Sequence, residues 1–305
     1  AEMILSGRAD TIVAGGVDMA SYAPVPHQKE LIDRLLAGSK GGPAKMLGTL
    51  ATTKPSLFFP KAPTITERYT GRTMGQHAEE MAQFYDISRE AQDEIALASH
   101  RNAAAAVEAG HIDQHRMTVT SGGSRVSEDN LIRPRMNAEK VAKLRPVFDK
   151  ENGSVTAASS SAITDGAAAC LVMSETKCKE LGLTPIAWVR GFGFSAIDPR
   201  RDLLMGNAWS IPLALEHAGI GFDDLDLFEI HEAFAAQLLC NLKVMADPEY
   251  CAREMGRDTP IGAVPRDKLN IWGGSLAFGH PFAATGCRLL TQLAQALPEV
   301  EGRFG

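Results

Sequence analysis

The first residues of the chain alternate between a helical pattern and a strand pattern. Residues 2–5 (EMIL) have the apolar spacing of the last turns of an amphipathic helix, and Gly7 follows as a stop. Residues 11–14 (TIVA) form a continuous apolar run closed by two glycines, which is typical of a buried strand. A helix followed at once by a buried strand indicates an α/β fold.

The pattern changes between about residue 21 and residue 149. Prolines interrupt this region repeatedly, and no run of residues resembles a strand. One helix is well marked over residues 88–110: Ser88 can cap its start, Ile95, Ala98 and Ala103 form an apolar stripe, and Gly110 ends it. We expect a mainly helical or irregular insertion between two strands.

The second half returns to alternating strand and helix patterns. Apolar runs predict strands within residues 165–175, at 186–190 and at 224–230. Helical spacing predicts helices at residues 175–182, 208–219 and 231–245, and a turn followed by a long helix from residue 269 onward. This alternation predicts sheets covered by helices, with a domain boundary near residues 183–185.

Composition and charge narrow the classes of function. The 305 residues are 45% hydrophobic and 22% charged, and the formal net charge of −6 disfavours nucleic acid or an anionic membrane as the main partner. No apolar run approaches the roughly 20 residues that span a bilayer, and the first residues lack the features of a signal peptide. The five cysteines form no CxxC pair and no metal-ligand spacing. We therefore expect no metal site and a cytoplasmic location, or the mitochondrial matrix if the source is eukaryotic.

Two histidines occupy positions typical of catalytic residues. His231 follows the predicted strand at residues 224–230 and begins the predicted helix at 231–245, which places it at the carboxyl end of a strand, where α/β proteins bind ligands. A positive helix end there would favour the neutral imidazole, and Glu232 in the first turn would suit the same dipole. The alternative is that His231 caps the helix and packs against its neighbours.

His280 has the stronger local signal. Gly279 permits unusual backbone angles, Pro281 restricts the residue before it to extended geometry, and the small residues that follow allow a closely packed helix. The other six histidines lie in polar or helical settings, and we expect most of them at the surface: His27, His77, His100, His111, His115 and His217. Residues 152–166, rich in small and hydroxyl side chains, would let a ligand approach the backbone.

Five separated motifs, in this order along the chain, resemble the thiolase family. They are ADTIVAGGVDMAS, RTMGQHAEEMA, KLRPVFDKENGSVTAASSSAITDGAAA, HEAFAAQ and GGSLAFGHPFAATGCRLL. The HEAF and GHPFAATG forms, with the long proline-rich insertion, are most similar to the 3-ketoacyl-CoA thiolase β-subunits of fatty-acid oxidation complexes. The resemblance implies a layered αβαβα fold, with residues 1–182 forming an N-terminal domain that carries the insertion at about 21–149, and residues 183–305 forming a C-terminal domain.

The resemblance also implies roles for individual residues. His280 matches the histidine that activates the nucleophilic cysteine, and His231 matches the position that orients a water in the oxyanion hole. Coenzyme A, as a substrate and not as a permanent cofactor, would contact the following residues: Met74, Arg133, Leu144, Phe148, Ala157, Ser161, Ile163, Met205, Ala233 and Phe234. Arg133 would serve the nucleotide end, and the aromatic and aliphatic residues would line the pantetheine tunnel.

The family's two catalytic cysteines match no position in this sequence. The resemblance places one just before residue 1 and the other just after residue 305, so we expect the chain to be a piece of a longer protein and to show no turnover by itself. The implied reaction is cleavage of a 3-ketoacyl-CoA by CoA. Two alternatives stay open: acetoacetyl-CoA synthesis by a biosynthetic relative, and a non-catalytic CoA-binding or scaffold subunit. The resemblance further implies a homodimer or tetramer that pairs with a hydratase-dehydrogenase subunit.

Overall fold

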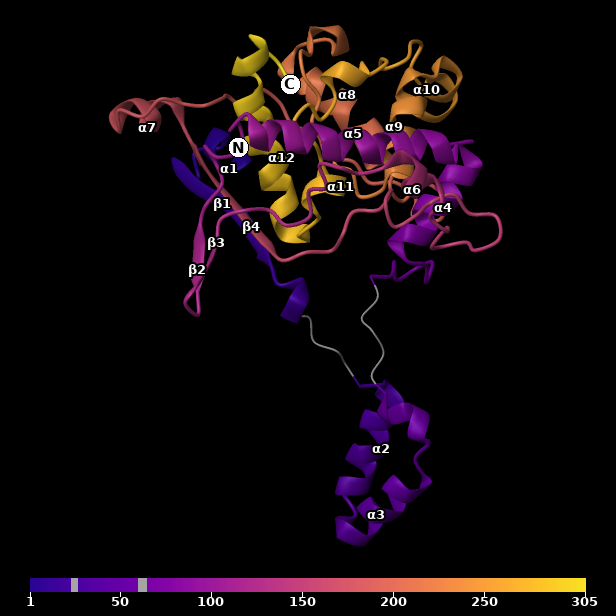
Figure 1. Cartoon of the computed structure of the whole chain (residues 1–305). Coiled ribbons are helices and arrows are strands. Elements are labelled where there is room, and N and C mark those ends of the chain that lie inside the picture. The colour runs from indigo at the N-terminus through magenta and orange to yellow at the C-terminus, as the bar shows by residue number, and fades with distance from the viewer. Residues whose placement is uncertain (23–26, 60–64) are drawn as a thin grey trace.

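The computed structural model describes residues 1–22, 27–59 and 65–305 (Figure 1). Positions 23–26 and 60–64 of the predicted insertion lie outside the described residues. The α-helices and strands follow one another in this order: α1 (Glu2–Leu5), β1 (Thr11–Asp18), α2 (Lys29–Ser39), α3 (Gly42–Thr52), α4 (Met74–Phe84), α5 (Arg89–Glu108), β2 (Val119–Ser121), β3 (Ser124–Val126), α6 (Ala138–Ala142), β4 (Gly166–Met173), α7 (Glu175–Glu180), α8 (Gly206–Ala218), α9 (Ala235–Ala246), α10 (Pro248–Met255), α11 (Ser275–Phe278) and α12 (Phe282–Ala296).

Strands β1 and β4 form an antiparallel ribbon on which the long helix α12 packs (Figure 1). Their exposure alternates residue by residue, so one face of the ribbon is covered and the other is open. Gly16 permits the contact with the helix, because a Cβ atom there would come within 2.2 Å of the carbonyl oxygen of Ala283. The backbone N–H of Ala283 in turn donates to the carboxylate of Asp18.

Helix α9 is the centre of the main hydrophobic core. Every residue from Ala235 to Leu242 is buried, and α4, α5, α8 and α10 pack around it. Helix α5 follows the sequence-based expectation closely: the Ser88 hydroxyl accepts from the N–H of Ala91, and the helix stops before Gly110, whose φ is 79°. These helices hold α9 in place, and the candidate site is built beside its first residues.

The insertion contains two parts that differ in their contacts. Helices α2 and α3 form a hairpin that packs on itself through buried Leu31 and Leu57 and extends away from the rest of the molecule in Figure 1. Helices α4, α5 and α6 instead join the main body. The expectation that the insertion holds no strand is wrong, because β2 and β3 pair as a short antiparallel hairpin across Gly122 and Gly123, both at positive φ.

Two of the predicted strands are not strands in the structure. Residues 186–190 form no sheet pairing with any described residue, and Ile186, Trp188 and Val189 are exposed. In residues 224–230 the apolar side chains are buried, but the segment makes only an isolated parallel bridge, Phe228 to Leu269. A strand exists only through its hydrogen-bonded neighbour, and the apolar pattern in these segments does not reveal whether the neighbour is there.

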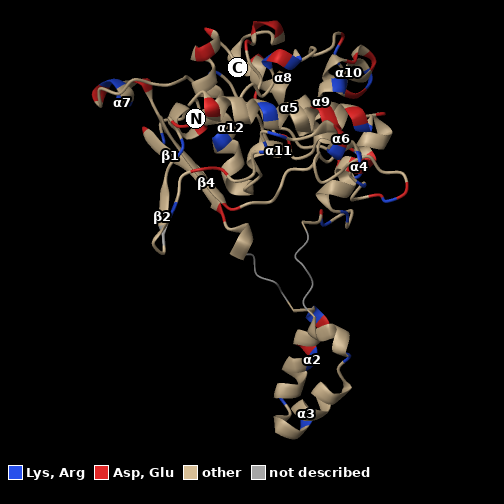
Figure 2. Ribbon diagram, in the orientation of Figure 1, with Lys and Arg blue, Asp and Glu red and all other residues tan. Residues whose placement is uncertain are grey.

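Charged side chains are spread over the molecule with both signs intermixed (Figure 2). Within the described part of the chain, no helix has the length and apolar character needed to cross a membrane. The same residues contain no cluster of three metal-ligating side chains.

Candidate functional site

His231 lies at the end of the buried segment 225–230, held there by Asn270. The Asn270 side chain accepts from the N–H of Ile230 at 2.8 Å and donates to the Ile230 carbonyl at 2.9 Å. Helix α9 begins only at Ala235, so the expectation that His231 starts a helix is wrong by four residues. A helix dipole therefore does not account for the state of this imidazole.

Glu232 fixes the chain immediately after His231. The expectation that it sits in the first turn of a helix is wrong, because α9 begins at Ala235. The carboxylate is buried and accepts from Ser99 Oγ at 2.7 Å, Asn270 Nδ2 at 2.6 Å and the N–H of Leu276 at 3.2 Å. Burial raises the pKa of Glu232, while the hydrogen bonds from Asn270 and Ser99 lower it. These three donors tie the segment of His231 to α5 and to α11.

His280 lies between α11 and α12, where Gly279 adopts a φ of 87°. A Cβ atom on Gly279 would come within 2.5 Å of the Thr164 side chain, so the turn needs glycine for both its backbone angle and its space. The N–H of His280 donates to the Ala162 carbonyl at 2.8 Å. The imidazole Nδ1 lies 2.7 Å from the hydroxyl of Thr285, one turn into α12.

The structure brings the two imidazoles together. Their ring centroids are 4.2 Å apart with the planes inclined at 52°. Burial, reinforced by His280 and Arg288, lowers the pKa of His231 to about 3. Burial and Arg288 likewise lower the pKa of His280 to about 4, against the opposing effect of Asp18. Both rings are therefore neutral at pH 7, so each can donate from one nitrogen and accept at the other.

The small-residue segment forms a wall beside the two rings. The N–H of Ser161 donates to the Ala233 carbonyl at 2.9 Å, and the N–H of Ala235 donates to the Ser159 carbonyl at 2.9 Å. The preceding residues are anchored by the Glu79 carboxylate of α4, which accepts from the N–H groups of Ser154 and Val155, both at 2.8 Å. Hydrogen bonds from both sides of the site therefore hold residues 154–162 in place.

Four of the ten residues expected to contact coenzyme A share one apolar cluster. Met74, Phe148, Ala233 and Phe234 pack together with buried Val155 and two alanines of α4. The Phe148 and Phe234 rings meet edge to face with centroids 5.9 Å apart. Gly75 makes room for Phe148, because a Cβ atom on Gly75 would lie 2.0 Å from that ring. The cluster adjoins His231 along the chain.

The remaining six residues occupy less uniform positions. Ser161 is half-buried beside the histidine pair, and Arg133, Leu144, Ala157 and Ile163 are exposed. Met205 is 0% exposed inside the main core, so the structure does not place it at any surface of the site. The N–H of Arg133 donates to Nδ1 of buried His100 at 3.1 Å, which anchors the backbone and leaves the guanidinium outside.

Sequence reasoning missed three polar residues around the histidines. Ser275 and Thr285 contact the two Nδ1 atoms, and half-buried Arg288 contacts Ser275. Thr285 and Arg288 stand on one face of α12 together with Gln292, at spacings of three and four residues. Polar residues recurring on the buried face of an otherwise apolar helix are the signal that would have found them.

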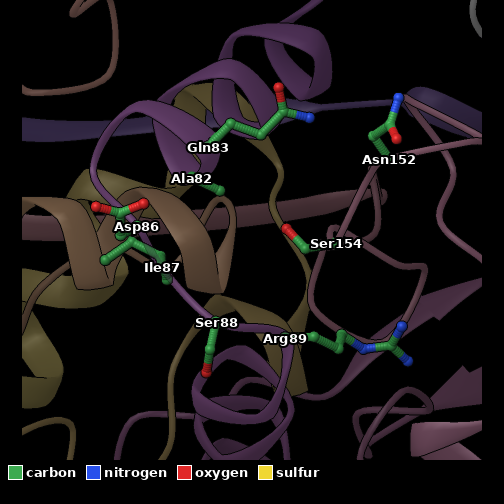
Figure 3. A pocket seen from close by; sticks show the side chains of 8 residues that line it. All are labelled: Ala82, Gln83, Asp86, Ile87, Ser88, Arg89, Asn152 and Ser154. Atoms are coloured by element: carbon green, nitrogen blue, oxygen red, sulfur yellow. The ribbon is translucent and has the colours of Figure 1, made fainter.

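The histidines at other positions do not follow the surface expectation. His77 and His100 are buried, His111 and His115 are half-buried against Trp272, and His27 and His217 are exposed. A hollow lies near the α4–α5 turn (Figure 3), and none of the twelve expected site residues lines it. Its lining is Ala82, Gln83, Asp86, Ile87, Ser88, Arg89, Asn152 and Ser154.

All five cysteines are free thiols. Cys178, Cys240 and Cys251 are buried, and Cys170 and Cys287 are half-buried on β4 and α12. Burial raises the pKa of Cys240 to about 12, and burial with the neighbouring Cys170 raises the pKa of Cys287 to about 11. A thiol held in its neutral form is a poor nucleophile, so neither of these two is suited to attack a carbonyl.

Comparisons with known proteins match the whole chain. Residues 1–176 match the family model "Thiolase, N-terminal domain", and residues 183–305 match "Thiolase, C-terminal domain". The chain is 45% identical over 311 residues to the 3-ketoacyl-CoA thiolase of Pectobacterium atrosepticum, covering 100% of this chain and 70% of that protein. It is 44% identical over 311 residues to the 3-ketoacyl-CoA thiolase of Colwellia psychrerythraea, covering 71% of that protein.

Solved structures show the same likeness. The human mitochondrial 3-ketoacyl-CoA thiolase in complex with CoA aligns with a TM-score of 0.78 at 29% identity, covering 99% of this chain and 68% of that one. The acetyl-CoA acetyltransferase of Bacillus anthracis aligns with a TM-score of 0.77 at 30% identity, covering 98% of this chain and 68% of that one. These matches confirm the predicted α/β fold class.

The low pKa of His231 predicts a stability that falls in acid. The folded state holds this imidazole neutral down to about pH 3, whereas the unfolded state takes up a proton near pH 6.5. Stability is therefore lost as pH falls below 6.5. In His231→Asn, the drop in the free energy of unfolding between pH 7 and pH 5 should shrink by about 1–2 kcal/mol. Urea denaturation at both pH values measures it, with His27→Asn as the exposed control. An unchanged pH dependence would contradict a neutral, buried ring.

Proposed function

Because the chain belongs to the thiolase family, we propose that its histidine pair forms the base and oxyanion-binding side of an active site that cleaves 3-ketoacyl-CoA with CoA. The products are acetyl-CoA and an acyl-CoA shortened by two carbons, as in fatty-acid β-oxidation. The observation that carries this proposal is the pair itself: two neutral imidazoles from separate segments with centroids 4.2 Å apart.

His280 is suited to act as the base. The Thr285 hydroxyl donates to the Pro281 carbonyl at 2.9 Å, which leaves its oxygen to accept from Nδ1–H of His280 at 2.7 Å. Nε2 then carries a lone pair that can take the proton of a thiol. A thiolate attacks the 3-carbonyl of the substrate, the Cα–Cβ bond breaks, and CoA thiolate then releases the acyl group from the enzyme's sulfur.

His231 is suited to stabilise negative charge on the thioester oxygen. Its Nε2 is buried and makes no hydrogen bond to any residue in the described ranges. An N–H at this atom would donate to an enolate oxygen, directly or through a water, in a site with little competing solvent. The acetyl unit leaves as an enolate, so a donor matched to that charge lowers the barrier to carbon–carbon cleavage.

The nucleophile and the proton-transfer cysteine are the parts that the chain's own thiols do not supply. The five cysteines present occupy β4, α7, α9, α10 and α12, and none is in a position that the family uses for catalysis. We therefore retain the proposal that both catalytic cysteines are outside these 305 residues.

Coenzyme A would lie along the apolar cluster and the small-residue wall. Phe148, Phe234 and Met74 offer surface for pantetheine, while the segment around Ser161 presents backbone without bulky side chains. The exposed guanidinium of Arg133 would face the phosphates at the nucleotide end. No permanent cofactor is needed for this chemistry.

We further propose the domain division and the location. Residues 1–182, with the insertion at about 21–149, form the N-terminal domain, and residues 183–305 form the C-terminal domain; the family models, which match on either side of this boundary, support it. Five unpaired thiols support a reducing compartment, the cytoplasm or a mitochondrial matrix.

Thiolysis by a polypeptide that carries this chain and both cysteine segments of the family would test the function. We expect cleavage of acetoacetyl-CoA and of longer 3-ketoacyl-CoA substrates. The loss of the substrate's enolate absorbance measures the rate. His280→Ala should lower kcat by about 10²–10⁴ because the base is removed, and Cys287→Ser should leave kcat unchanged. The 305-residue chain alone should show no turnover. Full activity of His280→Ala would refute the base role, and turnover by the 305 residues would refute the placement of the cysteines.

Gly75→Ala tests the pantetheine surface. The added Cβ must displace the Phe148 ring, which it would otherwise approach to 2.0 Å. We expect the dissociation constant of CoA, measured by calorimetry on the 305-residue chain, to rise about tenfold, equivalent to about 1.4 kcal/mol. Gly48→Ala in α3 is the matched control, because a Cβ there meets no atom within 4 Å. If both variants bound CoA with equal affinity, Phe148 would not belong to the CoA-binding surface.

We also propose that the chain forms a homodimer or tetramer, and that a hydratase-dehydrogenase subunit can join it. Support for self-association comes from the open face of the β1–β4 ribbon, where Val13, Val17 and Leu171 are all more than half exposed. A Val13→Lys, Val17→Lys double variant should sediment as a monomer under conditions in which the parent protein is a dimer. Leu181→Lys, at an exposed position outside the ribbon, is the control and should sediment with the mass of the parent dimer. A dimeric double variant would exclude this face.

A further inference from the structure

The hydroxyl of Ser275 lies between His231 and the half-buried Arg288. Ser275 is 0% exposed, and its Oγ lies 2.8 Å from Nδ1 of His231 and 2.7 Å from Nη2 of Arg288. A guanidinium has no acceptor, so Arg288 donates and Ser275 accepts. The hydroxyl proton of Ser275 then has one partner among the described residues, which is Nδ1 of His231.

The opposite arrangement would leave a buried proton without an acceptor. If Nδ1 of His231 carried the hydrogen, Ser275 would accept from both neighbours and its own O–H would face no acceptor. An unsatisfied buried donor costs about 1–3 kcal/mol. The hydrogen bonds therefore favour the tautomer in which Nδ1 of His231 accepts and Nε2 carries the proton.

Arg288 is held in place by partners of its own. Its Nη1 donates to Gln292 Oε1 at 3.2 Å and approaches Glu229 Oε1 at 3.4 Å. Gln292 is itself fixed, since its Nε2 donates to the Gly273 carbonyl at 2.7 Å. Rotation of the guanidinium away from Ser275 would require these contacts to break, so the direction in which the Ser275 hydroxyl points is determined by residues that lie outside the site.

We propose that Ser275 and Arg288 are positioning residues that fix His231 as the Nε2–H tautomer, so that its free nitrogen is always a donor. This inference rests on the proposed function, in which the donor serves the thioester oxygen. His280 receives the opposite assignment from Thr285: its Nδ1 donates, and its Nε2 accepts. Two neighbouring hydroxyls thus make one imidazole a donor and the other a base.

The tautomers can be read from the ¹⁵N chemical shifts of the imidazole nitrogens in ¹⁵N-histidine-labelled 305-residue chain at pH 7. His231→Asn and His280→Asn assign the signals. We expect a protonated Nε2 and an unprotonated Nδ1 for His231, and the reverse for His280. Protonated Nδ1 on His231 in the unsubstituted chain overturns the proposal. This measurement needs no turnover, so it stands or falls separately from the thiolase assignment.

Variants of the two hydroxyls separate positioning from general packing. Ser275→Ala should move the His231 signals toward a mixture of both tautomers and leave those of His280 as they were. Ser275→Thr, which keeps the hydroxyl, should preserve the parent pattern. Thr285→Val is the matched control, expected to change His280 alone. An unaltered His231 tautomer in folded Ser275→Ala overturns the proposal. If Ser275→Ala does not fold, the His231 tautomer in the unsubstituted chain and in Ser275→Thr decides whether the proposal holds.

The kinetic consequence is a selective loss in kcat. In the polypeptide that carries both cysteine segments, Ser275→Ala should lower kcat about tenfold to a hundredfold with KM changed less than threefold, because the donor matters most when the enolate forms. Ser275→Thr should restore most of the rate. A rise in KM of about tenfold to a hundredfold with kcat unchanged would instead assign Ser275 to substrate binding.

Discussion

The buried carboxylate of Glu232 is the contact on which the site depends. It joins Ser99 of α5, Asn270 of the preceding loop and the backbone of α11, so three separate segments are fixed by one side chain. Gly274 lets the chain pass, because a Cβ there would meet this carboxylate at 2.3 Å. A charge in such a place is costly unless it is fully hydrogen-bonded, and all three donors are present. The hydrogen bonds of Glu232 thus fix the positions of His231 and Ser275, which are its neighbour in sequence and the neighbour of Leu276.

The parts of the fold that sequence predicted well have local causes. The helix at α5 follows from its cap at Ser88 and its stop at Gly110, and β1 and β4 follow from short apolar runs, although β1 continues through Gly15 and Gly16 to Asp18. His280 could be identified because Gly279 and Pro281 constrain the backbone on either side. Each of these signals is contained within a few residues, and so it survives without knowledge of the tertiary structure.

What sequence could not supply depends on neighbours distant along the chain. Residues 186–190 have a strand pattern but no partner strand among the described residues. Glu232 was assigned to a first helical turn, and its buried hydrogen bonds were not foreseen because two of its donors come from the distant residues 99 and 270. Ser275, Thr285 and Arg288 were missed for a related reason. Their importance follows from the direction of their hydrogen bonds, and the residue types alone do not reveal that direction.

The histidine pair shows how burial and hydrogen bonding divide the work. Burial, together with the positive charge of Arg288, makes both rings neutral, but this leaves each ring free to carry its proton on either nitrogen. Two alike rings would then compete for the same roles as donor and base. The hydroxyls resolve this, since Ser275 gives its proton to one ring and Thr285 gives its proton to a backbone carbonyl. Burial and the nearby Arg288 therefore keep both rings neutral, and the Ser275 and Thr285 hydroxyls determine which nitrogen of each ring carries the proton.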